Sequence, residues 1–448
     1  MKHIFTTTVI LVGLFFGAFA TGQTPSTKPN IIVILSDDCG YNEFSMQGGT
    51  IATPCIDSIA ANGVRFTNGY VTGCVCSPTR AGLMTGRYQH RFGHEFNFPP
   101  RHDETVGLSL EETTIADVLK SGGYRTIALG KWHLGNYPQF NPCERGFNDF
   151  YGFMPAARSY WPLETSTRNN LMLNREQVIL EKFDYLTDHL ADKAVEYIKA
   201  ARGKPFFVYL AFNATHTPME ATEADLARAN GNTLTAMTFA LDRAVGKVLD
   251  VLKEEKIEKN TLVIFLNDNG GPGGYDNRPL RGTKSSLWEG GIRIPFAMQW
   301  PNVIPAGKVD DRPVISLDIF STAMAAAGIE QSPGKPLDGV NLLPYLTGKK
   351  MDRPHQVLYW RYADAWAVRE NDMKLVVPAR QSKQKAPFLF DLSKDISETK
   401  DLAAERPDDV QRLKNLYNVW QATHPPIAWP PDFAIDAEQS RNLWVAFP

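Results

Sequence analysis

This 448-residue chain contains five cysteines, which are Cys39, Cys55, Cys74, Cys76 and Cys143. Five is too few for a disulfide scaffold in a chain of this length, and an odd number leaves at least one thiol unpaired if the protein is exported. We therefore expect one cysteine to have a chemical role. The candidate is Cys76, which stands shortly before Pro78 and Arg80. The alternative is a buried structural cysteine in front of an ordinary proline turn.

Carboxylate and amide side chains follow two apolar runs and could form a metal site. Asp37 and Asp38 come just after the first run, and Asp268 and Asn269 come just after a later one. A ligand set of carboxylates and an amide suits a hard cation with flexible geometry, which favours Ca²⁺ over Mg²⁺. Either pair alone could be a turn, since Asp and Asn are common there. Two pairs, each after a buried strand, favour the metal site.

Apolar runs and amphipathic helical patterns alternate from about residue 29 to residue 330. The predicted strands cover 31–35, 126–129, 206–212 and 261–266, and the predicted helices cover 112–121, 185–201 and 233–255. This alternation predicts an α/β domain with a mostly parallel sheet flanked by helices. Sites in such sheets lie at the carboxyl ends of the strands, so we expect these polar segments to converge on one cleft.

The pattern changes after about Glu330, where a proline-rich connection begins. Four short strands are predicted at 357–362, 366–369, 374–377 and 388–391, followed by an amphipathic helix over 407–423. No long helix separates these strands. The segment 331–448 therefore predicts a smaller α+β domain, an antiparallel sheet with a helix packed on it.

The N-terminus has the features of a signal peptide covering residues 1–20. A short basic start precedes a mostly apolar run from Ile4 to Phe16, and Ala18-Phe19-Ala20 fits a cleavage pattern. The alternative, a membrane anchor, is less consistent with so short a run, and no later stretch is long and apolar enough to span a bilayer. We expect export to the periplasm or the extracellular space. The formal net charge of −2 gives no basic field for nucleic acid.

The segment from Cys76 to Arg87 resembles the C-x-P-x-R signature of the formylglycine-dependent (type I) sulfatases of the alkaline phosphatase superfamily. The resemblance extends from Pro29 to about Trp420 and includes Gly282–Gly291 and Phe388–Asp395. It implies an alkaline-phosphatase-like catalytic domain, a bound Ca²⁺ and oxidation of Cys76 to formylglycine by a maturation enzyme. The formylglycine would join Asp37, Asp38, Asp268 and Asn269 as a metal ligand. Its hydrate would attack sulfur with one hydroxyl and release sulfate with the help of the other.

The resemblance also assigns roles to cationic and titratable residues. Arg80 would anchor the formylglycine, and Lys131 would contact it and the sulfate. His133 would take the hydrate proton, while His216 and Lys284 would hold the sulfate and protonate the leaving alcohol. These assignments rest on the joint order of the residues, because a lone His or Lys is more often structural.

Three departures from the family pattern leave this mechanism intact. Glu43 stands where many relatives have Asp, and Cys39 and Cys74 are extra cysteines near the site. The cysteines raise the possibility of additional disulfides.

Substrate signals are weaker. His94, Asn148, Arg158, Trp161 and Arg361 offer rings, cations and an amide that could line the mouth of a carbohydrate site, although packing between the two domains is the favoured explanation. Exported bacterial-type members of the family often act on sulfated polysaccharides or glycosaminoglycans. The resemblance therefore implies a sulfated carbohydrate substrate.

Two alternatives stay open. One is a phosphonate monoester hydrolase or phosphodiesterase of the same superfamily, since phosphate and sulfate are both tetrahedral anions. The other is an inactive protein that only binds sulfated glycans, which loss of Cys76 or of a metal ligand would favour.

Overall fold

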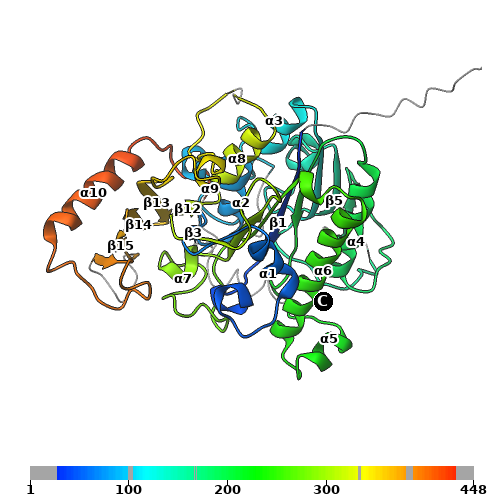
Figure 1. Ribbon diagram of the computed structural model, residues 1–448, viewed down its shortest axis with the longest axis horizontal. Helices are drawn as coiled ribbons and strands as arrows, with labels where there is room; N and C mark the ends of the chain where they lie inside the picture. Colours follow the sequence, from blue (N-terminus) through cyan, green and yellow to red (C-terminus); the bar gives the residue numbers. More distant parts are fainter. Residues whose placement is uncertain are drawn as a thin grey trace, which may run out of the picture.

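The structure, a computed structural model, describes residues 28–98, 104–165, 167, 169–330, 334–379 and 387–429. Its centre is a ten-stranded sheet (Figure 1). In spatial order the strands are β11 (Lys308–Asp310), β2 (Val64–Phe66), β10 (Phe296–Gln299), β9 (Thr261–Asn267), β1 (Asn30–Ser36), β8 (Phe206–Ala211), β4 (Arg125–Lys131), β5 (Asp149–Phe153), β6 (Met172–Leu173) and β7 (Glu176–Gln177). Strands β9, β1, β8, β4 and β5 are parallel, whereas β10, β6 and β7 run antiparallel to their neighbours.

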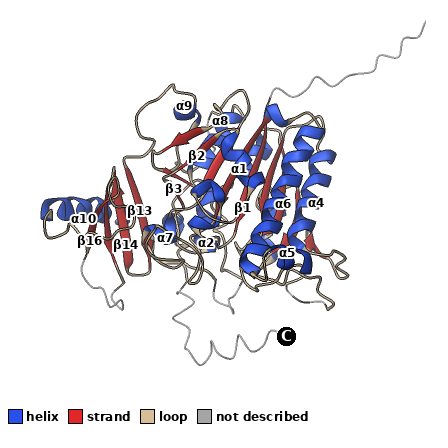
Figure 2. Cartoon of the chain, turned by 60° about the horizontal axis from the view of Figure 1, so that its bottom comes forward, coloured by secondary structure: helices blue, strands red, loops and turns tan. Residues whose placement is uncertain are grey.

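Helices cover both faces of this sheet, as Figure 2 shows. Alternate residues of β1 belong to two separate cores, because successive side chains of a strand point to opposite faces. Ile32 and Ile34 pack with α1 (Pro54–Ala61), α4 (Leu186–Ala200) and α6 (Thr233–Glu254). The other face of β1 packs with α2 (Cys76–Thr85), α3 (Ile115–Ser121) and α8 (Asp318–Ala326). A strand buried on both faces explains why its sequence is a continuous apolar run.

Strand register brings the polar segments to one edge of the sheet. Ser36 at the end of β1 is paired with Asn267 at the end of β9. The chain therefore leaves both strands at the same level, and the pairs that follow, Asp37-Asp38 and Asp268-Asn269, lie side by side. On the other side of β1, Leu35 is paired with Ala211 of β8, which in turn is paired with Gly130 of β4.

The smaller domain is a four-stranded antiparallel sheet of β13 (Val357–Tyr362), β14 (Ala365–Glu370), β15 (Met373–Val377) and β16 (Phe388–Asp391). The helix α10 (Pro407–Gln421) packs on it, with Tyr417 stacked on Trp366. Its core is shared with the large domain, since Tyr70 and Leu287 pack in the same cluster as Trp360. The small domain is thus attached through a continuous apolar interface.

The remaining elements are short. They are β3 (Gly69–Tyr70) with β12 (Val314–Ile315), the helices α5 (Glu223–Arg228), α7 (Glu289–Ile292) and α9 (Leu343–Leu346), and 3-10 turns such as η3 (Gln89–Phe92). Among the described residues, no helix is long and apolar enough to cross a membrane. The predicted signal peptide, residues 1–20, lies outside the described part of the chain.

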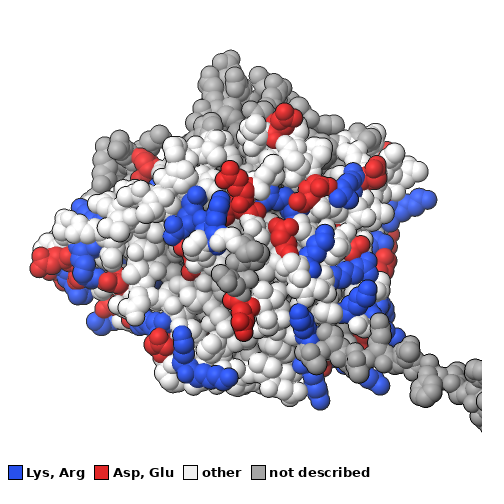
Figure 3. All heavy atoms as spheres, turned by 90° about the horizontal axis from the view of Figure 1, so that it is seen from above, with Lys and Arg blue, Asp and Glu red and all other residues white. Residues whose placement is uncertain are grey.

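The predicted fold class is confirmed, including the separate antiparallel sheet with its helix. On the face shown in Figure 3, Lys and Arg side chains are interspersed with Asp and Glu. This face carries no extended basic surface of the kind that nucleic acid requires.

Candidate active site

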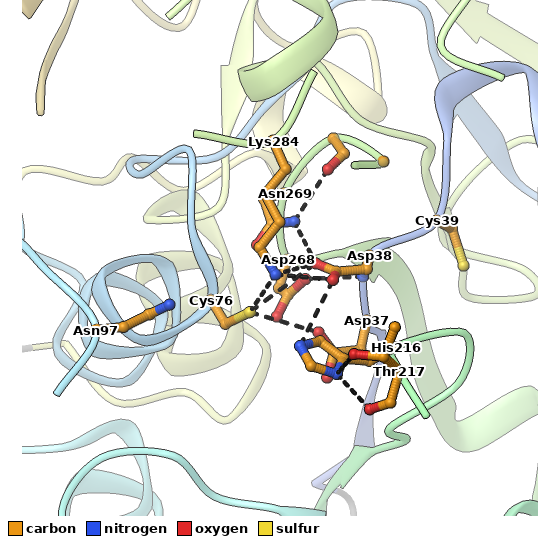
Figure 4. A network of polar contacts seen from close by, with 12 residues as sticks. Asp37, Asp38, Cys39, Cys76, Asn97, His216, Thr217, Asp268, Asn269 and Lys284 are labelled. Carbon is orange, nitrogen blue, oxygen red and sulfur yellow. Dashed lines mark hydrogen bonds and ion pairs between the residues drawn. The ribbon is translucent and has the colours of Figure 1, made fainter. Parts of the chain in front are cut away.

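Cys76 is the first residue of α2, and its side chain lies beside the acidic edge of the sheet (Figure 4). Its Sγ is 3.5 Å from Oδ1 of Asp37, 3.9 Å from Oδ1 of Asp38 and 3.3 Å from Nζ of Lys284. Burial raises the pKa of this thiol well above its usual value. An unmodified Cys76 is therefore a neutral thiol and a poor nucleophile at neutral pH.

Each carboxylate around Cys76 has a cationic partner. Nζ of Lys131 is 2.5 Å from Asp37, and Nζ of Lys284 is 2.6 Å from Asp38. Arg80 directs Nε and Nη2 to the same oxygen of Asp268, at 3.1 and 2.8 Å.

Arg80 also donates Nη1 to the carbonyl of Lys131 at 3.0 Å, which ties α2 to the end of β4. Burial alone would raise the pKa values of Asp37 and Asp38, but the adjacent cations, Lys131 and Lys284 respectively, outweigh it and lower them. Both carboxylates are therefore ionised.

Two histidines face the same cluster. Burial and the charge of Lys131 lower the pKa values of both His133 and His216, so each is neutral at neutral pH. Nδ1 of His216 lies 2.7 Å from the carbonyl of Thr217, which can only accept, so Nδ1 carries the proton. Nε2 of His216, 3.6 Å from Asp38, is therefore the nitrogen that can take up and release a proton.

Exposure separates an inner group of residues from an outer one. Cys76, Arg80 and Lys131 are at most 1% exposed, whereas the side chains of Lys284 and His216 are 15% and 16% exposed. Of these five residues, Lys284 and His216 are therefore the ones that a substrate can meet from solvent.

The donor set fits the predicted cation. Ligand atoms of Asp37, Asp38, Cys76 and His216 all lie within 4.8 Å of one another. Asn269 directs Nδ2 to Asp38 at 2.7 Å, while its Oδ1 is buried without a hydrogen-bond partner. A buried amide oxygen without a partner beside ionised carboxylates is what a hard cation would bind.

Comparison with known proteins agrees with this geometry. The family model described as Sulfatase matches residues 29–329 of the chain. The chain belongs to the sulfatase family. It is a sulfuric ester hydrolase of the alkaline phosphatase superfamily, as the signature around Cys76 predicts. A second model, N-sulphoglucosamine sulphohydrolase, C-terminal, matches residues 282–419 of this sulfatase.

Similar proteins span most of the sulfatase. Human N-acetylgalactosamine-6-sulfatase is 30% identical, with 88% of this chain and 85% of that protein covered. The uncharacterized sulfatase YdeN of Escherichia coli (strain K12) is 32% identical, with 76% and 70% covered. Among solved structures, Ps i-CgsB in complex with k-i-k-neocarrahexaose has a TM-score of 0.84 at 33% identity, covering 93% of this chain and 97% of that one.

The structure brings the predicted catalytic and metal-binding residues of the sulfatase together, but most of the expected substrate residues lie elsewhere. His94 is fully buried, and its Nε2 is 2.7 Å from Oγ of Ser77. Arg158 is 3% exposed and forms a bidentate ion pair with Glu181. The prediction that these side chains line a mouth is corrected, because both are held in internal contacts.

The other three expected substrate residues differ among themselves. Arg361 is ion-paired with Glu95, a contact that fits the alternative of internal packing. Asn148 hydrogen-bonds Thr126 at the start of β4, at the opposite edge of the sheet from Cys76. Trp161 is 37% exposed and is the one of the five that offers a ring to solvent.

All five cysteines lie in the described part of the sulfatase, and all are unpaired. Cys39 and Cys74 are fully buried, and Sγ of Cys39 lies 3.6 Å from Oγ1 of Thr215. The extra disulfides considered from the sequence are therefore absent.

Sequence reasoning missed several residues that hold the site in place. Oδ1 of Asn97 accepts the backbone N–H of Ser77 at 3.0 Å, one residue after Cys76. Glu398 of the small domain accepts the backbone N–H of Glu289 at 2.8 Å. Ser77 lies within the signature and Glu398 shortly after the family-like segment Phe388–Asp395, but nothing in the sequence gives their partners.

Proposed function

We propose that this sulfatase removes sulfate from a sulfated carbohydrate through a formylglycine derived from Cys76 and a bound Ca²⁺. The observation that carries the proposal is the position of Cys76. Its Sγ lies within 4 Å of two ionised carboxylates and a lysine, at the buried end of a site open on one side. A side chain at this point can react with an anion that is held by the surrounding cations.

The charge of the site suits a sulfate monoester. Asp37, Asp38 and Asp268 are matched by the three fixed cations Arg80, Lys131 and Lys284. A divalent cation added to this balanced set leaves an excess of positive charge, which favours an anionic group. When bound, Ca²⁺ supplies that charge, and the formylglycine hydrate supplies the attacking hydroxyl.

The inner residues orient the reacting group. Arg80 fixes α2 against Asp268 and the end of β4, so the first residue of the helix cannot move away from the carboxylates. Lys131 is fully buried, and a fixed ammonium in such a place stabilises developing negative charge without reorganisation. His133 is neutral, because burial and the charge of Lys131 lower its pKa. A neutral imidazole can accept a proton from a neighbouring hydroxyl.

The outer residues face the leaving group. Lys284 and His216 lie on the open side, where the alcohol of the ester must extend toward solvent. Because the neutral ring of His216 holds its proton on Nδ1, its Nε2 would have to take up a proton first, and it could then donate that proton to the departing alkoxide. Lys284 can stabilise the same oxygen as its charge grows.

A carbohydrate substrate is supported by the relatives. Human N-acetylgalactosamine-6-sulfatase is similar over most of the chain, and the solved structure of Ps i-CgsB holds k-i-k-neocarrahexaose. Both names denote carbohydrates. Export through residues 1–20 is part of the proposal, because polymeric sulfated carbohydrates occur outside cells.

Sulfate release from a panel of substrates tests the proposal. Enzyme loaded with Ca²⁺, with formylglycine at position 76 verified by peptide mass, is incubated with neocarrahexaose-type oligosaccharides, N-acetylgalactosamine 6-sulfate, glycosaminoglycan oligosaccharides and an aryl sulfate. A phosphodiester and a phosphonate monoester are included. Sulfate from a carbohydrate, abolished in Cys76→Ala, is the expected result. Hydrolysis of the phosphodiester to a phosphomonoester, or of the phosphonate monoester to the phosphonate, without sulfate release would support the alternative hydrolase. Binding without any hydrolysis would support the glycan-binding alternative.

A further inference from the structure

Ser77, directly after Cys76, joins three separate segments. Its Oγ donates to the carbonyl of His133 at 2.7 Å and lies 2.7 Å from Nε2 of His94. Its backbone N–H is bound by Asn97 at 3.0 Å. Ser77 is fully buried, so water cannot replace these partners. One residue therefore connects the start of α2, the 94–97 segment and the segment after β4.

The main chain of His133 has an unusual conformation that these contacts hold. Its φ is 55°, a left-handed value that costs a residue with a side chain about 1 kcal/mol or more. Its N–H donates to the carbonyl of Met154 at 3.0 Å, and its own carbonyl accepts from Ser77. Because the backbone conformation sets where the imidazole points, both bonds determine its direction.

His94 is the third residue of this arrangement, through its contact with Oγ of Ser77. The single hydroxyl hydrogen of Ser77 is directed to the carbonyl of His133, so Nε2 of His94 must be the donor to Oγ. His94 is neutral, since burial lowers its pKa to about 3, and its Nδ1 has no hydrogen-bond partner. The ring is enclosed by Trp429 and Phe98, at centroid distances of 4.6 and 5.6 Å.

Phe98, one of these aromatic residues, also contacts His133. The ring of Phe98 meets the imidazole of His133 edge to face at 5.3 Å, and Trp429 packs on Phe98 at 5.6 Å. Nε1 of Trp429 donates to the carbonyl of Asn97 at 3.3 Å. The chain that follows the small domain thus returns to the site and covers the residues behind His133.

We infer that Ser77 and His94 are positioning residues, which fix the imidazole of His133 relative to the residue at position 76. The inference rests on the proposed function, in which His133 accepts a proton from the hydrate. Neither residue faces the substrate side of the site. Their removal should slow the reaction and leave substrate binding largely unchanged.

The contacts of Ser77 with His94 and with the carbonyl of His133 form a bridge between the two histidines. Four variants test this bridge: Ser77→Ala, His94→Leu, the double variant and His94→Gln. The Gln amide can place a donor near the position of Nε2, so His94→Gln should recover part of the lost rate. His189→Leu is the control, because it breaks an imidazole–hydroxyl contact of 2.8 Å, to Tyr151, on another part of the fold. Formylglycine content is measured by mass in every preparation, and kcat is expressed per converted enzyme.

The expected result is a fall in kcat of about 10- to 100-fold in Ser77→Ala and His94→Leu, with KM changed less than about two-fold. The double variant should be no worse than the poorer single one. Parental kcat in both single variants would overturn the inference. If the parent enzyme releases no sulfate, that result counts against the proposed function and not against the bridge. A crystal structure of Ser77→Ala tests the bridge without any measurement of activity. In that structure His133 should leave its left-handed conformation. An unchanged His133 would show that Ser77 does not position it.

Discussion

Glu398 of the small domain accepts the backbone N–H of Glu289 at 2.8 Å, across 109 residues of sequence. The carbonyl of Glu398 also accepts Nη1 of Arg281 at 2.9 Å. Lys284 lies between Arg281 and Glu289, so one residue of the small domain holds both ends of the loop that carries it. These contacts link the small domain to the loop that carries Lys284.

Replacing Glu398 should therefore affect both stability and rate. Glu398→Ala leaves the N–H of Glu289 and one side of Lys374 without a partner, which should lower the free energy of unfolding by about 1–3 kcal/mol. It should also raise KM and lower kcat, because Lys284 loses its fixed position. Urea unfolding and steady-state kinetics measure the two effects. Glu405→Ala, at a largely exposed glutamate, is the control and should match the parent. A loss of stability with unchanged kcat and KM would show that the loop keeps Lys284 in position without Glu398.

Calcium should stabilise the folded enzyme. Because the buried oxygen of Asn269 and the carboxylates form one donor set, Ca²⁺ at 100 times its Kd should add about 2.7 kcal/mol to the free energy of unfolding. Mg²⁺ should add less, since it demands a stricter geometry. Thermal unfolding with EGTA, Ca²⁺ and Mg²⁺ measures this.

The variant Asp38→Asn tests the same metal site. Loss of one ligand charge should weaken Ca²⁺ binding in calorimetry by about 10-fold or more. Asp250→Asn, which alters an exposed carboxylate, should bind like the parent. Equal melting temperatures of the parent enzyme in EGTA and in Ca²⁺ would contradict the assigned ligands. Equal Ca²⁺ affinities of Asp38→Asn and the parent would do the same.

Glu43 should make stability depend on pH. It is 2% exposed, and burial raises its pKa to about 7. Between pH 4.5 and about 7 the folded protein therefore keeps a proton that the unfolded chain has released, so the free energy of unfolding falls as pH rises through this range. The full difference of pKa is worth about 3 kcal/mol.

The variant Glu43→Gln lacks this titration but keeps an oxygen for one of its backbone partners. The difference in unfolding free energy between parent and variant, measured with Ca²⁺ at pH 5 and pH 8, should change in the variant's favour as pH rises. Glu405→Gln controls for loss of a surface charge. Parallel pH curves for parent and Glu43→Gln would show that Glu43 titrates normally.

The sequence was sufficient to predict the elements that carry the site. Strands buried on both faces appear as continuous apolar runs, and this is why β1 and β9 and the polar pairs after them could be found. The pairing of Ser36 with Asn267 then follows from their shared place at the carboxyl edge. The antiparallel strands were equally clear, because short runs separated by turns admit few other arrangements.

The contacts around the site could not be predicted in the same way. His94 could be assigned either to a mouth or to internal packing, because a histidine near aromatic residues fits both a surface and a core. Its burial is decided by Trp429, which lies more than 300 residues later in the chain. Glu398 raises the same difficulty, since a glutamate in a loop gives no sign of the backbone group that it binds.

Arg80 shows how far geometry matters beyond charge. Its guanidinium reaches Asp268 through two nitrogens and the carbonyl of Lys131 through a third, and a lysine at this position could make only one of these bonds well. Arg80→Lys keeps the charge but should release the end of α2, with a fall in kcat of about 100-fold or more. Stability should fall by about 1–3 kcal/mol, because a buried carbonyl loses its donor.

The control for Arg80→Lys is Arg145→Lys. Arg145 is also buried and donates to three backbone carbonyls, those of Leu108, Ser109 and Glu112, but it does not contact the cluster around Cys76. Arg145→Lys should lose similar stability while its kcat stays within about two-fold of the parent. Kinetics at matched formylglycine content, together with urea unfolding, distinguish the two. If both variants lose rate in proportion to stability, the forked contact of Arg80 has no specific part in catalysis, and charge alone explains its place in the signature.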